Sequence, residues 1–134
     1  MVCTVAVDAM GGDRAPGEVV RGSVLAARAC PDDLHLLLVG QADRLEAELA
    51  LAGWQGSNLD IVGADEVIGM GESPVVALRK KKSSSISVAV NLVREGSADA
   101  VISAGNTGAC VAAATIRLGL LPSVRRAGIA VIFT

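Results

Sequence analysis

Short apolar runs alternate along the chain with segments whose apolar residues recur at helical spacing. The runs at residues 2–7, 35–39, 59–62, 100–103 and 127–133 have strand length and predict five strands. Helical spacing predicts helices at about residues 16–30, 45–52, 75–82, 86–93 and 107–118, the fourth of them preceded by a serine cap. This alternation predicts an α/β fold, with a mainly parallel sheet covered by helices on both faces.

The loops at residues 8–16, 63–74 and 103–107 each follow a predicted strand. Ligands of such sheets collect beyond the carboxyl ends of the strands, so we expect these loops to share one ligand-binding edge. We expect a single α/β domain over residues 1–134. The apolar run at the end of the chain indicates the N-terminal part of a longer protein.

Composition narrows the class of protein. Hydrophobic residues make up 51% of the 134 residues and charged residues 19%, which favours a packed core over disorder. A net charge of -2 gives no general attraction to nucleic acid. No apolar run is long enough for a membrane span, and no secretion signal is recognisable. Three scattered cysteines indicate reduced thiols in a cytoplasmic protein and predict no metal site.

Residues 103–109, Ser-Ala-Gly-Asn-Thr-Gly-Ala, join a predicted strand to a predicted helix. The first N–H groups of a helix lack internal partners, and the helix dipole adds partial positive charge there. This turn therefore predicts a site for a phosphate or a carboxylate-like group. The alternative is a glycine turn capped by Thr107 or Asn106.

Two further segments carry candidate chemistry. Residues 8–13, Asp-Ala-Met-Gly-Gly-Asp, place two glycines between carboxylates that can act as acids or bases, or form a turn in which Asp13 caps a helix. Residues 79–82, Arg-Lys-Lys-Lys, can bind phosphate or an acidic partner, or form a solvated helix end. We interpret His35 and Cys110 as structural residues. The pattern at residues 69–71, Gly-Met-Gly, lacks the third glycine of a dinucleotide site.

Three of these segments, in order and at matching spacing, resemble the bacterial phosphate acyltransferase family PlsX. They are residues 7–13, residues 73–82 and residues 103–109, with residues 91–96 fitting between the last two. The resemblance covers essentially the whole chain. It implies a three-layer α/β/α sandwich like that of isocitrate and isopropylmalate dehydrogenases.

The resemblance also implies an activity and partners. Family members convert acyl-[acyl carrier protein] and inorganic phosphate to acyl phosphate for phospholipid synthesis, without a cofactor. They are homodimers in the cytoplasm, associated peripherally with the inner face of the membrane. We predict catalytic roles for Asp8, Asp13 and Asn106. The predicted substrate-binding residues are Gly11, Gly12, Arg14, Lys80, Lys81, Lys82, Ser103, Gly105, Thr107 and Gly108.

One position departs from the family pattern. The family has His directly after Gly-Gly-Asp, and this chain has Arg14. An arginine cannot accept a proton at neutral pH, so the general base is left unassigned. Two alternatives stay open: a phosphotransacetylase-like enzyme that uses acyl-coenzyme A, and a non-catalytic fragment that binds phosphate or a partner.

Overall fold

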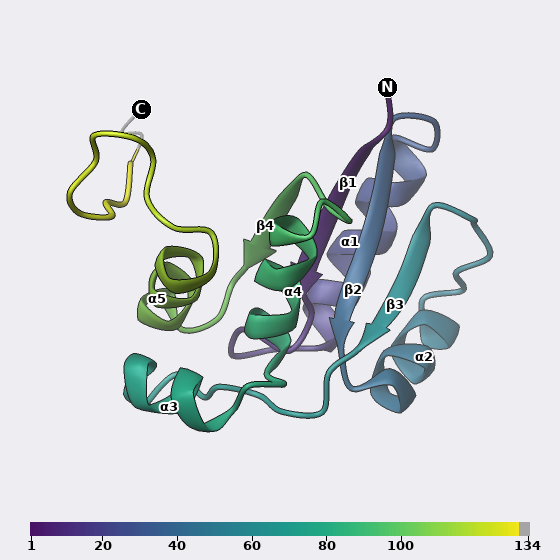
Figure 1. The fold of residues 1–134 in the computed structure, drawn as a ribbon. Coiled ribbons are helices and arrows are strands. Elements are labelled where there is room, and N and C mark those ends of the chain that lie inside the picture. The colour runs from purple at the N-terminus through teal and green to yellow at the C-terminus, as the bar shows by residue number, and fades with distance from the viewer. Residues whose placement is uncertain (132–134) are drawn as a thin grey trace.

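Four parallel strands form the centre of the protein, for which a computed structural model describes residues 1–131 (Figure 1). The strands are β1 (Cys3–Asp8), β2 (Leu34–Gly40), β3 (Leu59–Gly63) and β4 (Ala100–Ser103). Their order across the sheet is β3-β2-β1-β4. The predicted parallel α/β architecture is therefore confirmed.

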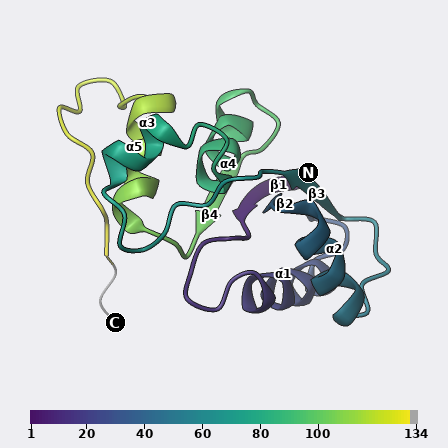
Figure 2. The same cartoon turned by 90° about the horizontal axis from the view of Figure 1, so that it is seen from below.

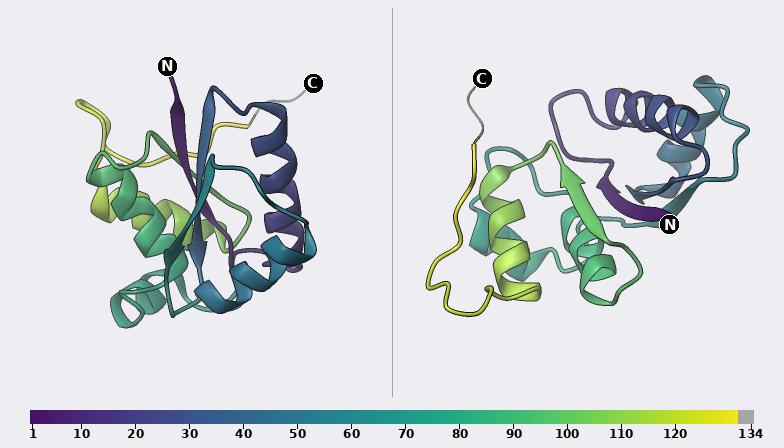
Figure 3. Two further views of the ribbon diagram at one scale, coloured as in Figure 1. Left: turned by 90° about the vertical axis from the view of Figure 1, so that its right-hand side faces the viewer. Right: turned by 90° about the horizontal axis from the view of Figure 1, so that it is seen from above.

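Helices cover both faces of this sheet, as Figures 2 and 3 show. On one face lie α1 (Gly17–Ala29) and α2 (Ala42–Leu51), which pack on β2 and β3. On the other face α4 (Ser85–Arg94) packs on β1, β2 and β4, and α5 (Thr107–Arg117) packs on α4 and on α3 (Pro74–Lys80). No helix within residues 1–131 has the length and hydrophobicity needed to cross a membrane.

The strand order follows from the direction of the crossovers. The chain passes from β1 to β2 and β3 through α1 and α2, and then returns past β1 to form β4. Right-handed crossovers in opposite directions place their helices on opposite faces. The loops after β1 and β4 therefore leave the sheet on different sides, and the crevice between them is the usual ligand site of such sheets.

The core is split between the two faces because successive strand residues point to opposite sides. In β1, Val5 and Val7 pack with Val20 of α1, whereas Ala6 packs with Ala89 of α4. A third cluster joins α3, α4 and α5 through Leu78, Ile86, Val90 and Ala113, among others. The strands and helices that bear the loops of the carboxyl edge are thus packed on both faces of the sheet.

Two predicted helix caps differ in the structure. Ser84 precedes α4, but its hydroxyl donates to Ser87 Oγ at 2.9 Å, and its side chain does not cap the helix. That position is buried, so the hydroxyl bonds to the neighbouring serine. The alternative in which Asp13 caps a helix is also wrong, because α1 begins at Gly17, next to Pro16, and Asp13 is exposed.

The predicted fifth strand at residues 127–133 is wrong for residues 127–131, and residues 132 and 133 lie outside the described residues. Residues 127–131 are exposed, with Ile129 and Val131 both 63% accessible, and they form no strand. In Figure 1 this yellow segment lies beyond α5, away from the sheet. An apolar run forms a strand only where a neighbouring backbone pairs with it, and within residues 1–131 no strand pairs with this segment.

Candidate functional site

The last residues of β1 and β4 meet side by side at the carboxyl edge of the sheet. Asp8 is in register with Ser103, and the Ser103 hydroxyl donates to Asp8 Oδ2 at 2.7 Å. The backbone N–H of Gly105 donates to Ser103 Oγ at 3.1 Å. These contacts form a short chain of hydrogen bonds from the turn before α5 to a carboxylate in the central strand.

Asp8 is the buried charged residue of this edge, with 4% of its surface accessible. Its second oxygen, Oδ1, is buried, and no protein group within the described residues donates to it. Leaving a buried polar atom unpaired costs about 1–3 kcal/mol, so such atoms in native proteins call for an explanation. The position of Oδ1 at the ligand edge of the sheet favours one explanation: this oxygen accepts a proton or a hydrogen bond from a ligand.

Glycines allow the two loops to approach each other closely. A Cβ placed on Gly11 would lie 2.6 Å from Asp8 Oδ2 and 2.9 Å from the Gly105 nitrogen. Gly12 has a φ of 114°, which side chains rarely tolerate, and a Cβ there would lie 3.3 Å from the Ala104 carbonyl oxygen. The predicted glycine positions are therefore required by contact between the loops.

A small cavity lies at this junction. The volume in which the centre of a water molecule can lie is about 10 Å³, which is close to the minimum that holds one water molecule. The lining residues come from the loops after β1, β3 and β4 and from α4 and α5: Asp8, Gly11, Val67, Ile68, Ser85, Ile86, Ser103, Asn106 and Ala109. The three loops that were predicted to share one edge do so.

The N-terminus of α5 points to the same junction. Asn106 caps the helix, because its Oδ1 accepts the N–H of Ala109 at 3.0 Å. The capped turn considered as an alternative therefore exists, and it uses Asn106 rather than Thr107. The turn keeps its positive end, since the first N–H groups of an eleven-residue helix have no intrahelical partner.

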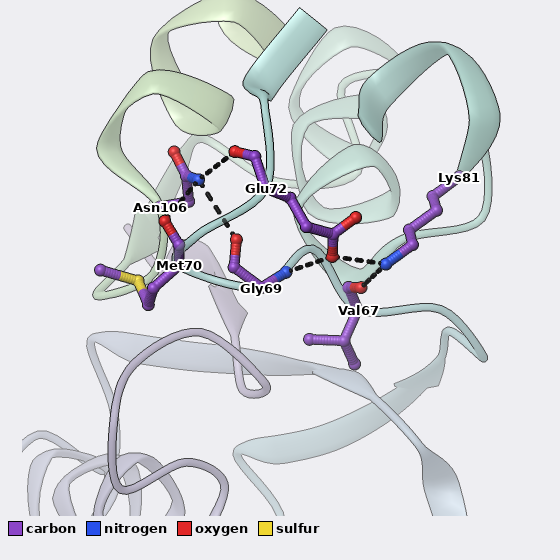
Figure 4. A network of polar contacts seen from close by, with 6 residues as sticks. All are labelled: Val67, Gly69, Met70, Glu72, Lys81 and Asn106. Carbon is purple, nitrogen blue, oxygen red and sulfur yellow. Dashed lines mark hydrogen bonds and ion pairs between the residues drawn. The ribbon is translucent and has the colours of Figure 1, made fainter. Parts of the chain in front are cut away.

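The amide nitrogen of Asn106 is already committed to protein contacts (Figure 4). It lies 3.2 Å from the carbonyl oxygens of Gly69 and Met70 and 3.1 Å from that of Glu72. Two amide hydrogens face three acceptors, so no donor is left over for another group. The predicted catalytic role of Asn106 stays a prediction, and the observed contacts are those of a residue that holds a loop.

Lys81 holds the same loop from the opposite side. Its ammonium donates to the carbonyl oxygen of Val67 at 2.7 Å and to Glu72 Oε1 at 2.6 Å. Glu72 Oε1 also accepts the N–H of Gly69 at 2.7 Å. The hydrogen bond from Lys81, then that from Gly69, lower the pKa of Glu72 below its ordinary value.

Other predicted site residues lie apart from the cavity. Asp13 and Arg14 are exposed and do not line it, and Lys80 and Lys82 are exposed near the end of α3. The packing of α3 against α5 explains the glycine at position 108, because a Cβ there would lie 2.7 Å from Pro74 Cγ. The catalytic role predicted for Asp13 and the binding roles predicted for the other four residues stay predictions.

The two residues interpreted as structural have packing or pairing partners. His35 Nε2 lies 2.9 Å from Asp60 Oδ2 on the neighbouring strand. Cys110 packs against the cluster of α3, α4 and α5. Burial and, to a smaller extent, the charge of Asp8 raise the pKa of its thiol, which is the opposite of activation.

The sequence placed the loop after β3 at this edge, but none of its residues was predicted to belong to the site. Val67 and Ile68 line the cavity, and Glu72 links Lys81 to the loop backbone. Nothing in the composition of this loop distinguishes Glu72 from a solvated loop residue.

Comparison with known proteins gives the same assignment as the motifs. A family model described as fatty acid synthesis protein matches residues 3–133. Curated proteins named phosphate acyltransferase from Heliobacterium modesticaldum, Akkermansia muciniphila and Clostridium acetobutylicum are 54%, 49% and 45% identical to this chain. The alignments cover 96%, 93% and 91% of this chain and 38%, 36% and 37% of the relatives.

The chain thus spans somewhat more than a third of the length of these curated relatives. The resemblance to phosphate acyltransferases, inferred from three motifs in register, is confirmed by identity along nearly the whole chain. On this match, the chain belongs to the family of fatty acid synthesis proteins.

Proposed function

We propose that this chain forms the phosphate-binding edge of a phosphate acyltransferase. The reaction converts acyl-[acyl carrier protein] and inorganic phosphate to acyl phosphate and free carrier protein, for phospholipid synthesis. The observation that carries the proposal is the unpaired, buried oxygen of Asp8 beside the head of α5. Relatives that share this chain's sequence are named phosphate acyltransferase.

The head of α5 supplies the positive end of the site. The backbone N–H groups of Thr107 and Gly108 are the donors that an incoming phosphate would meet first. The Gly105 N–H and the Ser103 hydroxyl already donate to Ser103 Oγ and Asp8 Oδ2. The helix dipole adds partial positive charge, which a low-dielectric site makes more effective. No protein nucleophile is needed, since a phosphate oxygen can attack the thioester carbonyl directly.

We assign to Asp8 the transfer of the proton that phosphate loses. A phosphate oxygen that carries hydrogen can donate it to Asp8 Oδ1, which also removes the repulsion between two anions. A bond then forms between the phosphate oxygen and the carbonyl carbon, the bond from that carbon to sulfur breaks, and the thiolate takes up the proton. Ser103 holds the other carboxylate oxygen in place. Arg14, exposed and unable to accept a proton, takes no part in this transfer.

The excess of positive charge in the part of the chain after Leu78 supports an acidic carrier protein as the acyl donor. Eight of the 12 Lys and Arg residues, but only two of the 14 Asp and Glu residues, lie after Leu78. Arg79, Lys80 and Lys82 are exposed, whereas Lys81 is turned to Glu72 and Val67. We assign docking to the three exposed cations, because opposite charges steer association.

The proposal extends to the whole protein as the resemblance implies. We propose an isocitrate/isopropylmalate dehydrogenase-like fold, a cytoplasmic homodimer and peripheral contact with the inner face of the membrane. The three layers seen in Figure 3 support the fold, and the exposed apolar residues Met70, Val75 and Val76 support a contact surface. Light scattering during size-exclusion chromatography tests the dimer, and flotation with vesicles tests the membrane contact.

The decisive experiment measures acyl phosphate, trapped by hydroxylamine, from the full-length protein with each acyl donor. We expect product with acyl-[acyl carrier protein] and none with acyl-coenzyme A. Activity with acyl-coenzyme A alone would point to a phosphotransacetylase-like enzyme. Binding of carrier protein without product would point to a non-catalytic protein.

Charge reversal locates the docking surface. The Lys80→Glu, Lys82→Glu double variant should raise KM for the acyl carrier protein substrate at least tenfold at low salt, with KM for phosphate unchanged. Arg94→Glu, at the end of α4, is the matched control for one reversed charge and should have little effect. Equal effects of reversal at α3 and at Arg94 would remove α3 as the docking site.

A further inference from the structure

The loop formed by residues 67–72 closes the candidate site, although it belongs to no helix or strand. Val67 and Ile68 line the cavity next to Asp8 and Ser103, and Ile68 is buried against the α3, α4 and α5 cluster. Figure 4 shows this loop lying between Asn106 and Lys81. Its position decides how much room the site has.

The room left under this loop is too small for the proposed substrate. The cavity accepts about one water molecule, whereas phosphate carries four oxygen atoms around phosphorus. The strands and α5 are regular, packed elements, whereas residues 67–72 form no helix or strand and are buried only at Ile68, so this loop is the wall that can move. An anion therefore reaches Asp8 Oδ1 through this cavity only when residues 67–72 shift outward.

Two side chains hold the loop in the closed position. The amide nitrogen of Asn106 contacts three of its carbonyl oxygens, at Gly69, Met70 and Glu72. Lys81 contacts the Val67 carbonyl oxygen and the Glu72 carboxylate. The other end of the Asn106 amide is fixed by the Ala109 N–H, which orients the nitrogen toward the loop.

We propose that Asn106 is a positioning residue whose side-chain amide latches residues 69–72 over the cavity beside Asp8, with Lys81 as the second tie. The latch sets the balance between a closed site that excludes water and an open site that admits phosphate. This role rests on the proposed function and differs from the direct contact with substrate predicted from the sequence.

Asn106→Ser separates the latch from the helix cap. Serine is as good an N-cap as asparagine, so α5 keeps its cap, but the amide donors to the three carbonyls are lost. Lys81→Gln weakens the second tie from the other side of the loop. Asn91→Ser is the matched control. The side-chain oxygen of Asn91, on α4, accepts a hydrogen bond from Arg117, on α5, and this contact lies away from the loop.

Hydrogen exchange tests the latch without any activity. The N–H groups of Gly69 and Glu72 are bonded inside the loop, to Glu72 Oε1 and to the Gly69 carbonyl oxygen. We expect both to exchange about tenfold faster in Asn106→Ser and faster in Lys81→Gln, with no change in Asn91→Ser. Unchanged exchange in Asn106→Ser overturns the proposal, whether or not the protein forms acyl phosphate.

Kinetics of the full-length protein distinguish a latch from a ligand. For a latch, Asn106→Ser lowers kcat, because the loop closes less well over the bound anion, while KM for phosphate does not rise, since the anion's own donors are intact and the open site is more populated. A rise of tenfold or more in KM for phosphate would mean that Asn106 binds the anion directly, and would overturn the positioning role. A wild-type protein that forms no acyl phosphate contradicts the proposed function and leaves the exchange test standing.

Discussion

Gly11 lies where the loop after β1 crosses the turn after β4, with no room for a side chain. A Cβ at this position would lie 2.6 Å from Asp8 Oδ2, 2.9 Å from the Gly105 nitrogen and 3.0 Å from the Gly105 Cα. Two of these atoms are backbone, and the third belongs to a side chain held by Ser103. Gly11→Ala therefore forces the two loops apart or moves the Asp8 carboxylate.

The loss of stability in Gly11→Ala follows from the atoms that must move to admit the methyl group. Inserting a methyl group into a packed site costs about 1–3 kcal/mol, and the loss of the hydrogen bond between Ser103 and Asp8 would place Gly11→Ala at the upper end. Gly22, inside α1, is the matched control, because a Cβ there meets nothing within 4 Å. Gly22→Ala should stabilise the protein by about 0.5–1 kcal/mol, since alanine loses less backbone entropy in a helix.

Thermal unfolding followed by circular dichroism measures both variants. For a domain of this size roughly 3–5 °C corresponds to 1 kcal/mol, so the midpoint should fall by about 9–15 °C in Gly11→Ala and rise by about 2–5 °C in Gly22→Ala. A Gly11→Ala protein as stable as wild type, beside a stabilised Gly22→Ala, would show that the loops are not in contact as described.

Two further predictions concern titratable side chains. Burial and the charge of Asp8 raise the pKa of Cys110, so iodoacetamide at neutral pH should modify this thiol more slowly than the exposed Cys3 and Cys30. Peptide mass mapping measures the labelling at each cysteine, and fastest labelling at Cys110 would contradict this expectation. Because folding lowers the pKa of Glu72, its ionised form stabilises the fold at pH values above its ordinary pKa of 4.5, and this stabilisation is lost as pH falls through the lowered pKa. The difference in unfolding free energy between wild type and Glu72→Gln should accordingly be present at pH 7 and vanish in acid, and a difference independent of pH would contradict the ion pair with Lys81.

Most of the elements could be predicted because their signals are local. Strand runs and helical spacing recur within ten to fifteen residues, and glycines after α2 and α4 end those helices with positive φ at Gly53 and Gly96. The run at residues 127–131 shows the limit of this reasoning. Its apolar pattern is that of a strand, but a strand forms only where another backbone is available to pair with it.

By itself the sequence determined the α/β class and placed three loops at one edge of a parallel sheet. It also brought Ser103 and Gly105 forward through an anion site at a helix start, and Asp8 and Gly11 through a glycine turn between carboxylates. Only the tertiary structure decided that β1 lies beside β4, which joins Asp8 to Ser103 across 95 residues. It also decided that Lys81 faces the loop while Lys80 and Lys82 face solvent. Hydrogen bonds between distant segments depend on how elements pack and where side chains point, and local residue patterns carry no record of either.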